Sequence, residues 1–322
     1  MQKPGKVVVT GGAGFIGSHL ADRLVFQGNE VVVIDNLSTG RLEFLARCKG
    51  KPNFKFVKAD LLKPEQYSRE LAGAQAIYHL AANPDIKAAI TNTRVEIDQG
   101  VLSTYNLLEQ ARIRDVPSIV FSSSSVVYGE PRVVPVPEDY GPLTPISLYG
   151  GSKLAGEGFL SAYCGTFGMK GIAYRFANIV GERATHGVLY DFSLKLRKNP
   201  RFLEVLGDGK QTKSYILVEE CVDAILFGAG KRLPKISSSM DVFNIANSDW
   251  VSVAEIARQV IEASGSKGTK ISFTGGARGW PGDVPKVMLD GARLAKLGWT
   301  PKCNSLDTIK EAARIIWKET GA

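Results

Sequence analysis

The stretch TGGAGFIGSH, residues 10–19, carries the strongest structural signal in this chain of 322 residues. Its glycines Gly11, Gly14 and Gly17 recur every third residue, between a β-branched run and a helix-like pattern. Glycines at this spacing allow a tight turn and let backbone N–H groups approach a pyrophosphate at the positive end of the helix. The stretch therefore predicts a strand–turn–helix unit that binds a dinucleotide.

A carboxylate stands at the end of the next predicted strand. The run EVVVI at 30–34 is followed by Asp35, 18 residues after Gly17. An acid in this place accepts hydrogen bonds from both hydroxyls of an adenosine ribose and repels a 2′-phosphate. We therefore expect NAD rather than NADP. Asp60 and Leu61, after the third predicted strand, are candidates for contact with the adenine.

Strand-like and helix-like segments alternate through the first half of the chain. The predicted strands span 6–10, 30–34, 54–58, 76–80, 118–122 and 171–176, and the clearest helices span 19–26, 101–114 and 153–167. Unbroken apolar runs suit strands that are buried on both faces. Alternation of strand and helix implies a doubly wound parallel sheet with right-handed crossovers.

This alternation ends after about residue 177, where glycines, prolines and short strands separate isolated helices. Those helices are predicted at 218–227, 252–263 and 306–318. We therefore expect an α/β protein with a dinucleotide-binding domain over 1–177. A smaller mixed α/β domain over 178–322 would bind the substrate, and the chain can cross between the two domains more than once.

The composition is that of a globular protein, with 44% hydrophobic and 22% charged residues, which excludes disordered, collagen-like and coiled-coil classes. No apolar run approaches the roughly 18 residues of a membrane span. The first predicted strand begins at Lys6, which leaves no room for a secretory signal peptide. We expect a cytoplasmic protein that does not bind membranes.

Charge and metal-ligand residues exclude two further classes. The four cysteines and three histidines are scattered without a CxxC pair, so we expect reduced thiols and no metal site. A net charge of +8 suits an anionic ligand. Because the cations are spread evenly and are not interleaved with aromatic residues, we do not expect nucleic-acid binding.

A second group of candidate residues lies in YGGSK, residues 149–153. Positions i and i+4 share one face of a helix, so Lys153 can lie beside Tyr149. A neighbouring cation stabilises the phenolate and lowers the pKa of Tyr149, which would make it a base near neutral pH. Upstream, the serine run 122–125 ends a predicted strand at the carboxyl edge of the sheet, where such sheets bind ligands.

Taken together, the chain resembles the extended short-chain dehydrogenase/reductase family, and within it the nucleotide-sugar 4-epimerases. The matching segments, in order, are TGGAGFIGSH (10–19), DNLSTG (35–40), DL (60–61), HLAA (79–82), FSSSSVVYG (121–129), YGGSK (149–153), RFANIVGER (175–183), THGVLYDF (185–192), LGDGKQTKSYILVEE (206–220) and RGWPGDVPK (278–286). The resemblance implies a Rossmann fold, a homodimer formed by the helices near 100–114 and 153–167, and NAD-dependent interconversion of UDP-galactose and UDP-glucose through a 4-keto sugar.

The resemblance also implies residue roles. Ser124 falls on the catalytic hydroxyl position, Tyr149 on the base, and Lys153 on its partner and ribose ligand. NAD contacts fall on the three glycines and on Phe15, Ile16, Asp35, Asn36, Leu37, Ser38, Thr39, Gly40, Asp60, Leu61, Leu80, Ala81 and Ala82. Contacts with the UDP-sugar fall on Ser124, Asn178, Gly187, Val188, Leu189, Val205, Leu206, Lys213, Arg278 and Asp283.

Four positions depart from the family pattern. Gly100 stands where relatives often carry Asn, and Gln99 could supply the missing contact. Lys213 replaces an Arg and keeps its charge but not its bidentate geometry. Trp280 stands where many relatives have Arg. Val287 replaces a bulky Tyr, which could admit an N-acetyl group at C2 of the sugar.

Other activities remain open at this point. A 4,6-dehydratase would need Asp-Glu directly after the central hydroxyl residue, where Ser125 and Val126 stand. A net dehydrogenase or reductase would consume added NAD(P). A non-enzymatic NAD-sensing or RNA-binding relative would not need Tyr149 and Lys153. UDP-N-acetylhexosamine and UDP-uronic acid are alternative epimerase substrates.

Overall fold

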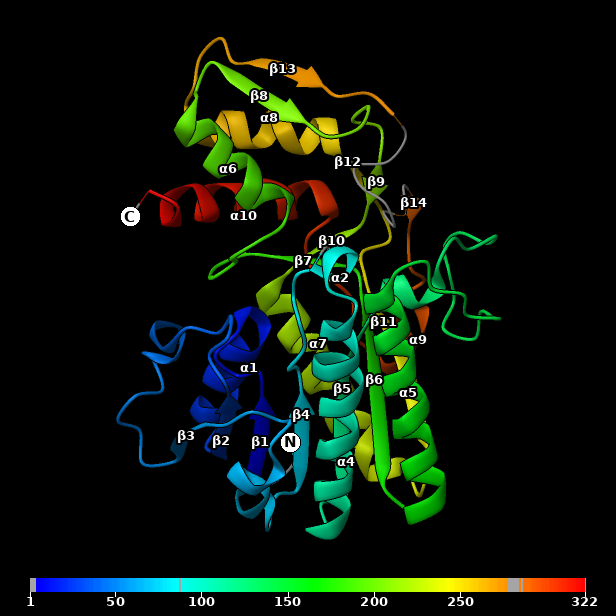
Figure 1. Cartoon of the computed structure of the whole chain (residues 1–322). Helices are drawn as coiled ribbons and strands as arrows, with labels where there is room; N and C mark the ends of the chain where they lie inside the picture. The colour runs from blue at the N-terminus through cyan, green and yellow to red at the C-terminus, as the bar shows by residue number, and fades with distance from the viewer. Residues whose placement is uncertain (1–3, 87, 277–283, 285, 322) are drawn as a thin grey trace. The chain divides into compact units, whose positions relative to one another are not determined.

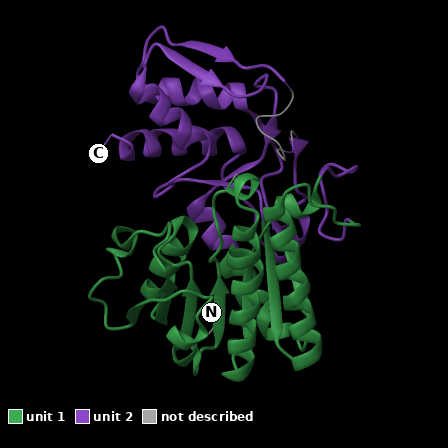
Figure 2. Ribbon diagram, viewed as in Figure 1, with its two compact units in different colours: residues 1–129, 141–175, 225–243 green, residues 130–140, 176–224, 244–322 purple. Residues whose placement is uncertain are grey.

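The computed structural model describes residues 4–86, 88–276, 284 and 286–321. The chain folds into two compact units, shown in Figure 2. Unit 1 comprises residues 1–129, 141–175 and 225–243, and unit 2 comprises residues 130–140, 176–224 and 244–322. The chain therefore passes from one unit to the other several times.

Unit 1 is built on a seven-stranded sheet in the order β11-β6-β5-β4-β1-β2-β3. Its strands are β1 (Lys6–Thr10), β2 (Glu30–Asp35), β3 (Phe54–Lys58), β4 (Ala76–His79), β5 (Ser118–Ser124), β6 (Lys170–Phe176) and β11 (Met240–Ile245). The pairs β1–β2, β2–β3, β1–β4 and β4–β5 are parallel. The strand order reverses between β1 and β4, and in such sheets a ligand lies at the carboxyl ends of the strands at this point. The predicted doubly wound fold is confirmed.

The central strands of this sheet are buried on both faces, as their apolar runs predicted. Val8, Val32, Ile77 and Ile119 are at most 1% exposed and belong to one core. Its helices are α1 (Phe15–Phe26), α2 (Ala88–Thr91), α3 (Arg94–Glu96), α4 (Ser103–Ile113), α5 (Leu148–Phe167) and α7 (Val218–Arg232), the last of which begins in unit 2. Figure 1 shows α4 and α5 running along β4, β5 and β6.

Shorter helical segments complete unit 1. They are the 3-10 turns η1 (Leu42–Leu45), η2 (Pro64–Gln66), η3 (Ser68–Leu71), η5 (Ser125–Tyr128) and η6 (Leu233–Lys235), and the π-helical segment η4 (Ile97–Leu102). The helix predicted over 101–114 is thus divided into η4 and α4. Such π-helical turns occur frequently at functional sites.

Two helices begin earlier than the sequence pattern predicted. Helix α1 begins at Phe15 instead of residue 19, directly after Gly14. Helix α5 begins at Leu148 instead of residue 153, because the Ser147 hydroxyl accepts a hydrogen bond from Gly150 N at 3.1 Å and caps the first turn. Glycines weaken the helix signal in both first turns. The Ser147 cap and packing hold the start of α5 helical, whereas α1 has no side-chain cap.

The described residues of unit 2 form three small sheets and a group of helices. Its strands are β7 (Asn178–Val180) paired with β10 (Tyr215–Leu217), β8 (Phe202–Val205) paired with β13 (Lys270–Phe273), and β9 (Thr212–Lys213) paired with β12 (Val251–Ser252) and β14 (Lys286–Val287). Its helices are α6 (Val188–Lys198), α8 (Val253–Ser264), α9 (Ala292–Leu297) and α10 (Ser305–Glu319). Apolar faces of α6, α8 and α10 form a core of their own, which includes Leu196, Ile256 and Ile309. In the part of the chain that the structure describes, every helix is too short or too polar to span a bilayer.

Candidate active site

The glycine-rich turn joins β1 to α1 in a conformation that requires glycine. Gly11 has φ +69°, and a Cβ atom there would lie 2.6 Å from the backbone nitrogen of Ala81. A Cβ on Gly17 would overlap the carbonyl oxygen of Gly11. The predicted contacts Leu80, Ala81 and Ala82 directly follow β4, so this turn packs against the loop that contains them.

The first turn of α1 is suited to a phosphate. Gly14 is its N-cap and offers no side chain to the N–H groups of the first turn, and no acidic residue lies in that turn. Phe15 and Ile16 are the first helical residues. Unsatisfied N–H groups and the helix dipole favour an anion here.

Asp35 lies at the end of β2, as predicted, and is only 8% exposed. Its Oδ2 accepts a hydrogen bond from Ala13 N at 2.9 Å, and its Oδ1 accepts one from Leu37 N at 2.8 Å. Burial raises the pKa of Asp35, and these two hydrogen bonds partly oppose that rise. An ionised carboxylate has about four lone-pair sites, so two hydroxyl groups of a ribose can still be accepted.

The loop after Asp35 folds back onto the turn. Leu37 has φ +61°, and a Cβ on Gly40 would lie 2.8 Å from Asp35 Oδ1. Asn36, Ser38 and Thr39 complete this loop, and Ser38 N donates to Asn36 Oδ1 at 2.9 Å. The glycine turn, the open end of α1 and the buried carboxylate together fit an NAD molecule.

The predicted adenine contacts are less accessible. Asp60 is partly buried, and its Oδ1 accepts from Leu62 N at 3.0 Å. The side chain of Leu61 belongs to the core, and its carbonyl oxygen accepts from Asn106 Nδ2 at 3.0 Å. Asp60 can therefore face a ligand, whereas the Leu61 side chain stabilises the fold.

The predicted catalytic residues all lie in unit 1. Ser124 is the last residue of β5, and its Oγ accepts from Val126 N at 3.4 Å. Tyr149 and Lys153 occupy the first two turns of α5 and share one face. The buried Lys153 Nζ donates to the Ser122 carbonyl oxygen at 2.7 Å and lies 5.7 Å from the centre of the Tyr149 ring.

The electrostatics of this group correct one prediction. We expected Lys153 to lower the pKa of Tyr149, but burial and then the charge of Glu96 raise it. Burial lowers the pKa of Lys153 to about 8, against the opposing charges of Glu96 and Glu157. Without a ligand, Tyr149 is therefore a protonated phenol at neutral pH. The sequence spacing showed the cation but neither the burial nor the carboxylate.

The described residues predicted to contact the UDP-sugar all lie in unit 2, apart from Ser124. Asn178 begins β7, and its Nδ2 donates to the Ser214 carbonyl oxygen at 3.1 Å. Gly187 caps α6 with φ +98°, and Val188 begins that helix. Leu206 is exposed beyond the end of β8.

Two of these residues contribute to the core instead of presenting a side chain. Leu189 and Val205 are at most 1% exposed and belong to the core of unit 2, so only their backbone atoms could face a ligand. Lys213 lies on β9, where it pairs with Val251 and Val287. Arg278 and Asp283, together with Trp280, lie outside the described residues.

Three buried polar clusters in unit 1 were not predicted from the sequence. The first joins Ser123, Glu157 and Arg175, the second joins Asn83, Glu96 and Ser152, and the third joins Thr10, His79 and Thr104. A partial signal existed for the first cluster, because Glu157 continues the four-residue spacing of Tyr149 and Lys153. The other clusters join residues that are distant in sequence.

The third cluster fixes the protonation state of His79. Thr104 Oγ1 donates to the Gly100 carbonyl oxygen at 2.6 Å, so it accepts from His79 Nε2 at 3.0 Å. His79 Nδ1 then accepts from Thr10 Oγ1 at 2.7 Å. Burial, followed by the charge of Lys153, lowers the pKa of His79 to about 3. The imidazole is therefore neutral in the folded protein.

This burial predicts an acid-labile fold. An unfolded histidine binds a proton below about pH 6.5, whereas the folded one does not, so stability falls as the pH decreases through 6.5 towards 3. We expect this single group to reduce the free energy of unfolding by about 2 kcal/mol between pH 8 and pH 5. His79→Gln, which can still accept and donate, should lose that part of the decrease in urea titrations at the two pH values. An equal decrease in both proteins would contradict the assignment.

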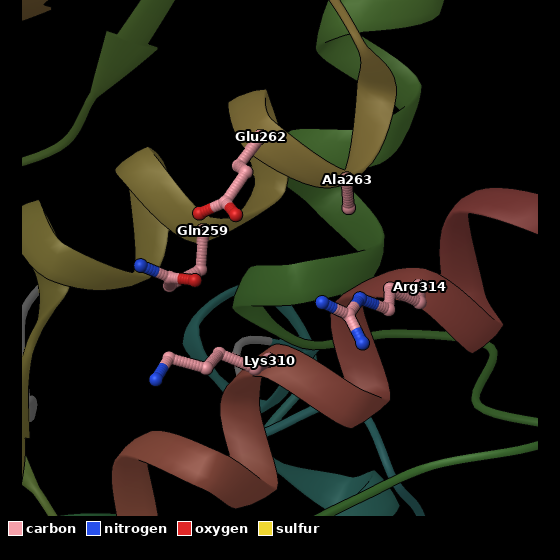
Figure 3. Close-up of a pocket in the computed structure, with 5 residues that line it drawn as sticks. All are labelled: Gln259, Glu262, Ala263, Lys310 and Arg314. Atoms are coloured by element: carbon pink, nitrogen blue, oxygen red, sulfur yellow. The ribbon is translucent and has the colours of Figure 1, made fainter.

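A separate cavity of about 180 Å³ lies between α8 and α10 in unit 2 (Figure 3). It is lined by Gln259, Glu262, Ala263, Lys310 and Arg314. None of the described residues predicted to bind NAD or substrate lines it. We therefore assign it no role in the candidate site.

The sequence and the fold of this chain were compared with those of known proteins, and both resemble NAD-dependent enzymes that act on nucleotide sugars. Residues 7–246 match the NAD dependent epimerase/dehydratase family. The UDP-glucose 4-epimerase of Mycolicibacterium smegmatis is 32% identical over 92% of this chain and 94% of its own. A crystal structure of a UDP-galactose 4-epimerase superposes with a TM-score of 0.88 at 41% identity, covering 98% of this chain and 99% of that one. UDP-glucuronic acid decarboxylase 1 of Xenopus tropicalis is 31% identical over 92% of this chain and 68% of its own. The chain therefore belongs to the NAD-dependent epimerase/dehydratase family and uses NAD as its cofactor.

Proposed function

We propose that this protein is a 4-epimerase that interconverts UDP-galactose and UDP-glucose. The observation that carries the proposal is the arrangement of Tyr149 and Lys153 on one face of α5, with the Lys153 ammonium bonded to the end of β5 that holds Ser124. This arrangement lies in the same unit as the NAD site. Two of the three relatives named above are a UDP-glucose 4-epimerase and a UDP-galactose 4-epimerase, which supports an epimerase among the family's reactions.

The residues of the turn and of β2 would hold the cofactor. The first turn of α1 would bind the pyrophosphate, Asp35 the adenosine ribose, and Lys153 the second ribose. Bound NAD supplies reversible uptake of hydride from C4 of the sugar. Because the C4 hydrogen is not acidic, proton transfer alone could not invert that carbon.

The side chains of the chain would move the proton and hold the oxygen. Tyr149 would take the proton of the O4 hydroxyl and return it, while Ser124 would donate a hydrogen bond to O4. Since burial raises the pKa of Tyr149, its phenol should ionise only when more positive charge comes to lie beside it. The base would thus be formed in the loaded site and not in the empty one.

Unit 2 would hold the nucleotide part of the substrate. Asn178 and Lys213 offer an amide and a cation to a diphosphate, and the uncapped start of α6 at Gly187 offers backbone N–H groups. Tethering by the diphosphate would let a 4-keto sugar turn over without leaving. The returned hydride would then arrive on its opposite face.

UDP-N-acetylhexosamine is a second candidate substrate. Val287 lies on β14 directly beside Lys213, the residue proposed to hold the diphosphate. Its side chain is smaller than the tyrosine that the family pattern has there, and the smaller residue would admit an N-acetyl group at C2 of the sugar. Comparing kcat/KM for UDP-galactose and UDP-N-acetylgalactosamine distinguishes the two substrates.

The experiment that tests the proposal is incubation of the purified protein with UDP-galactose and no added cofactor. We expect UDP-glucose to form, because the hydride is returned and NAD is not consumed. Stoichiometric reduction of added NAD would show a net dehydrogenase instead. Release of water with formation of a 4-keto-6-deoxy sugar would show a dehydratase.

We also propose that the protein is a homodimer through α4 and α5. Tyr105 and Phe159 are 42% and 38% exposed, and their ring centres lie 6.3 Å apart across the two helices. Ile113 and Phe167, near the ends of the same two helices, are 49% and 50% exposed. A second copy of the chain would cover these apolar side chains. Tyr105→Glu with Phe159→Glu should convert a dimer to a monomer in analytical ultracentrifugation, and a wild-type monomer would contradict the proposal.

A further inference from the structure

Glu96 is a carboxylate buried beside the proposed catalytic helix, with only 2% of its surface exposed. Its Oε2 accepts a hydrogen bond from Ser152 Oγ at 2.8 Å, and its Oε1 accepts one from Asn83 Nδ2 at 3.0 Å. Ser152 lies between Tyr149 and Lys153 on α5. Asn83 follows the loop 80–82 that is predicted to contact NAD. One carboxylate thus joins the cofactor loop to the turn of α5 that presents both proposed catalytic groups.

The chain makes room for this contact at Gly100. A Cβ on Gly100 would lie 2.5 Å from Ser152 Cβ and 3.4 Å from Glu96 Oε2. Gly100 lies in the π-helical segment η4, which directly follows Glu96. The space that an asparagine side chain would need at this position is therefore occupied by Ser152 and Glu96. Glycine is the residue that fits here, because it lets Ser152 approach the backbone of η4.

In the described part of the chain, no cation is bonded directly to the Glu96 carboxylate. Among the described residues, no lysine or arginine nitrogen is recorded within 4.0 Å of it, whereas Glu157 is fully paired with Arg175. The other titratable groups around Lys153 are Tyr149 and the neutral His79. Of the two buried carboxylates that favour the charged form of Lys153, Glu96 therefore contributes more than the paired Glu157.

We propose that Glu96 is a positioning residue for the reaction, which ties α5 to the cofactor loop through Ser152 and Asn83 and keeps the buried Lys153 in its charged form. This inference rests on the proposed roles of Tyr149 and Lys153. A buried lysine favours its neutral form unless a negative charge lies nearby. Since a neutral Lys153 could not stabilise the Tyr149 phenolate, the charge of Glu96 supports the base through Lys153.

The direct test measures the titration of Lys153 by NMR of protein labelled with ¹³C at the lysine ε-carbons. The Lys153 signal is the one missing from Lys153→Met, and its midpoint should lie near 8. In Glu96→Gln the midpoint should decrease by roughly 1 pH unit. Asp98→Asn is the matched control. Asp98 lies two residues after Glu96 and forms an exposed ion pair with Arg94, so this variant removes the same formal charge from a solvated position. Equal midpoints in the two variants would overturn the proposal.

The pH dependence of epimerisation tests the consequence for the reaction. Removing a negative charge lowers the pKa of both Tyr149 and Lys153, so both limbs of the kcat/KM profile of Glu96→Gln should move to lower pH. Ser152→Ala keeps the charge but loses the contact, so kcat should fall about tenfold with the limbs unmoved. A purely structural role would lower the Glu96→Gln profile without moving it.

The two proposals can fail independently. The NMR titration needs no substrate. If Glu96→Gln shifts the Lys153 midpoint but the wild-type protein has no epimerase activity, the effect of Glu96 on Lys153 stands and the proposed function is rejected. If Glu96→Gln does not fold, Glu96→Asp serves, because it keeps the charge and shortens the reach to Ser152. We then expect an unmoved midpoint with a reduced kcat, and an unchanged kcat would overturn the positioning role.

Discussion

Tyr149→Phe should lower kcat for the conversion of UDP-galactose by a factor of about 10²–10⁴. The substitution removes the hydroxyl that we propose takes the O4 proton, and it keeps the ring that packs near Lys153. KM for the UDP-sugar should change little, because the residues proposed to hold the diphosphate lie elsewhere. Product formation is measured by chromatography of the UDP-sugars, and bound NAD is measured by releasing it from denatured protein.

Tyr163→Phe is the matched control for this variant. It makes the same change on the same helix, where the Tyr163 hydroxyl donates to Glu109 Oε2 at 3.0 Å instead of facing the proposed site. We expect activity close to that of the wild type. Full activity in Tyr149→Phe, with NAD still bound, would reject Tyr149 as the base.

The sequence predicted six of the seven strands of the unit 1 sheet because their signal is local, and it missed only β11, which lies beyond the alternating first half of the chain. Two strands, Lys6–Thr10 and Phe54–Lys58, were predicted at the bounds that the structure has. Apolar β-branched runs are read directly from neighbouring residues, and the glycine turn requires its own backbone conformation. These features need no knowledge of distant residues.

The starts of α1 and α5 could not be read in the same way. Glycines in the first turn of each helix lower its helical propensity by about 1 kcal/mol per residue relative to alanine. In α5 the Ser147 cap and the burial of Gly150, Ser152 and Lys153 outweigh that cost. Cap and burial depend on the folded chain, so a pattern search began the helix too late.

The charge environment of the site was also beyond the sequence. Glu96 lies 53 residues before Tyr149, and only the packing of η4 on α5 brings its charge close. Helical spacing identified Lys153 as the partner of Tyr149 but could not show that burial outweighs that cation. The direction predicted for the pKa of Tyr149 was wrong for this reason.

Glu157 and Arg175 form the buried ion pair on which the second large effect depends. Both side chains are 5% exposed, and Arg175 Nη2 donates to Glu157 Oε2 at 2.7 Å while Nε donates to Oε1 at 2.9 Å. Ser123 Oγ also donates to Glu157 Oε1, at 2.5 Å. The pair therefore fixes α5 against both β6 and the end of β5, next to Ser124.

Arg175→Met should reduce the free energy of unfolding by roughly 3–5 kcal/mol, because it leaves the Glu157 carboxylate buried without its cation. Urea unfolding curves measure the loss. Arg112→Met is the matched control, since the Arg112–Glu109 pair has the same bidentate chemistry but side chains 38% and 27% exposed. That variant should lose much less stability than Arg175→Met, because solvent screens an exposed ion pair. Similar decreases in the free energy of unfolding in the two variants would show that burial does not determine how much the Glu157–Arg175 pair contributes to stability.

The double variant Glu157→Leu with Arg175→Met separates the pair's contribution from the cost of an orphaned charge. Replacing both partners by apolar residues removes the unpaired carboxylate, so it should restore much of the stability lost in Arg175→Met. Activity should not recover with it, because Ser123 then loses its acceptor and the end of β5 is no longer held against α5. A stable double variant with a low kcat would show that the buried pair positions Ser124 and Tyr149 more than it stabilises the fold. Recovery of both properties would mean that packing alone aligns β5 with α5.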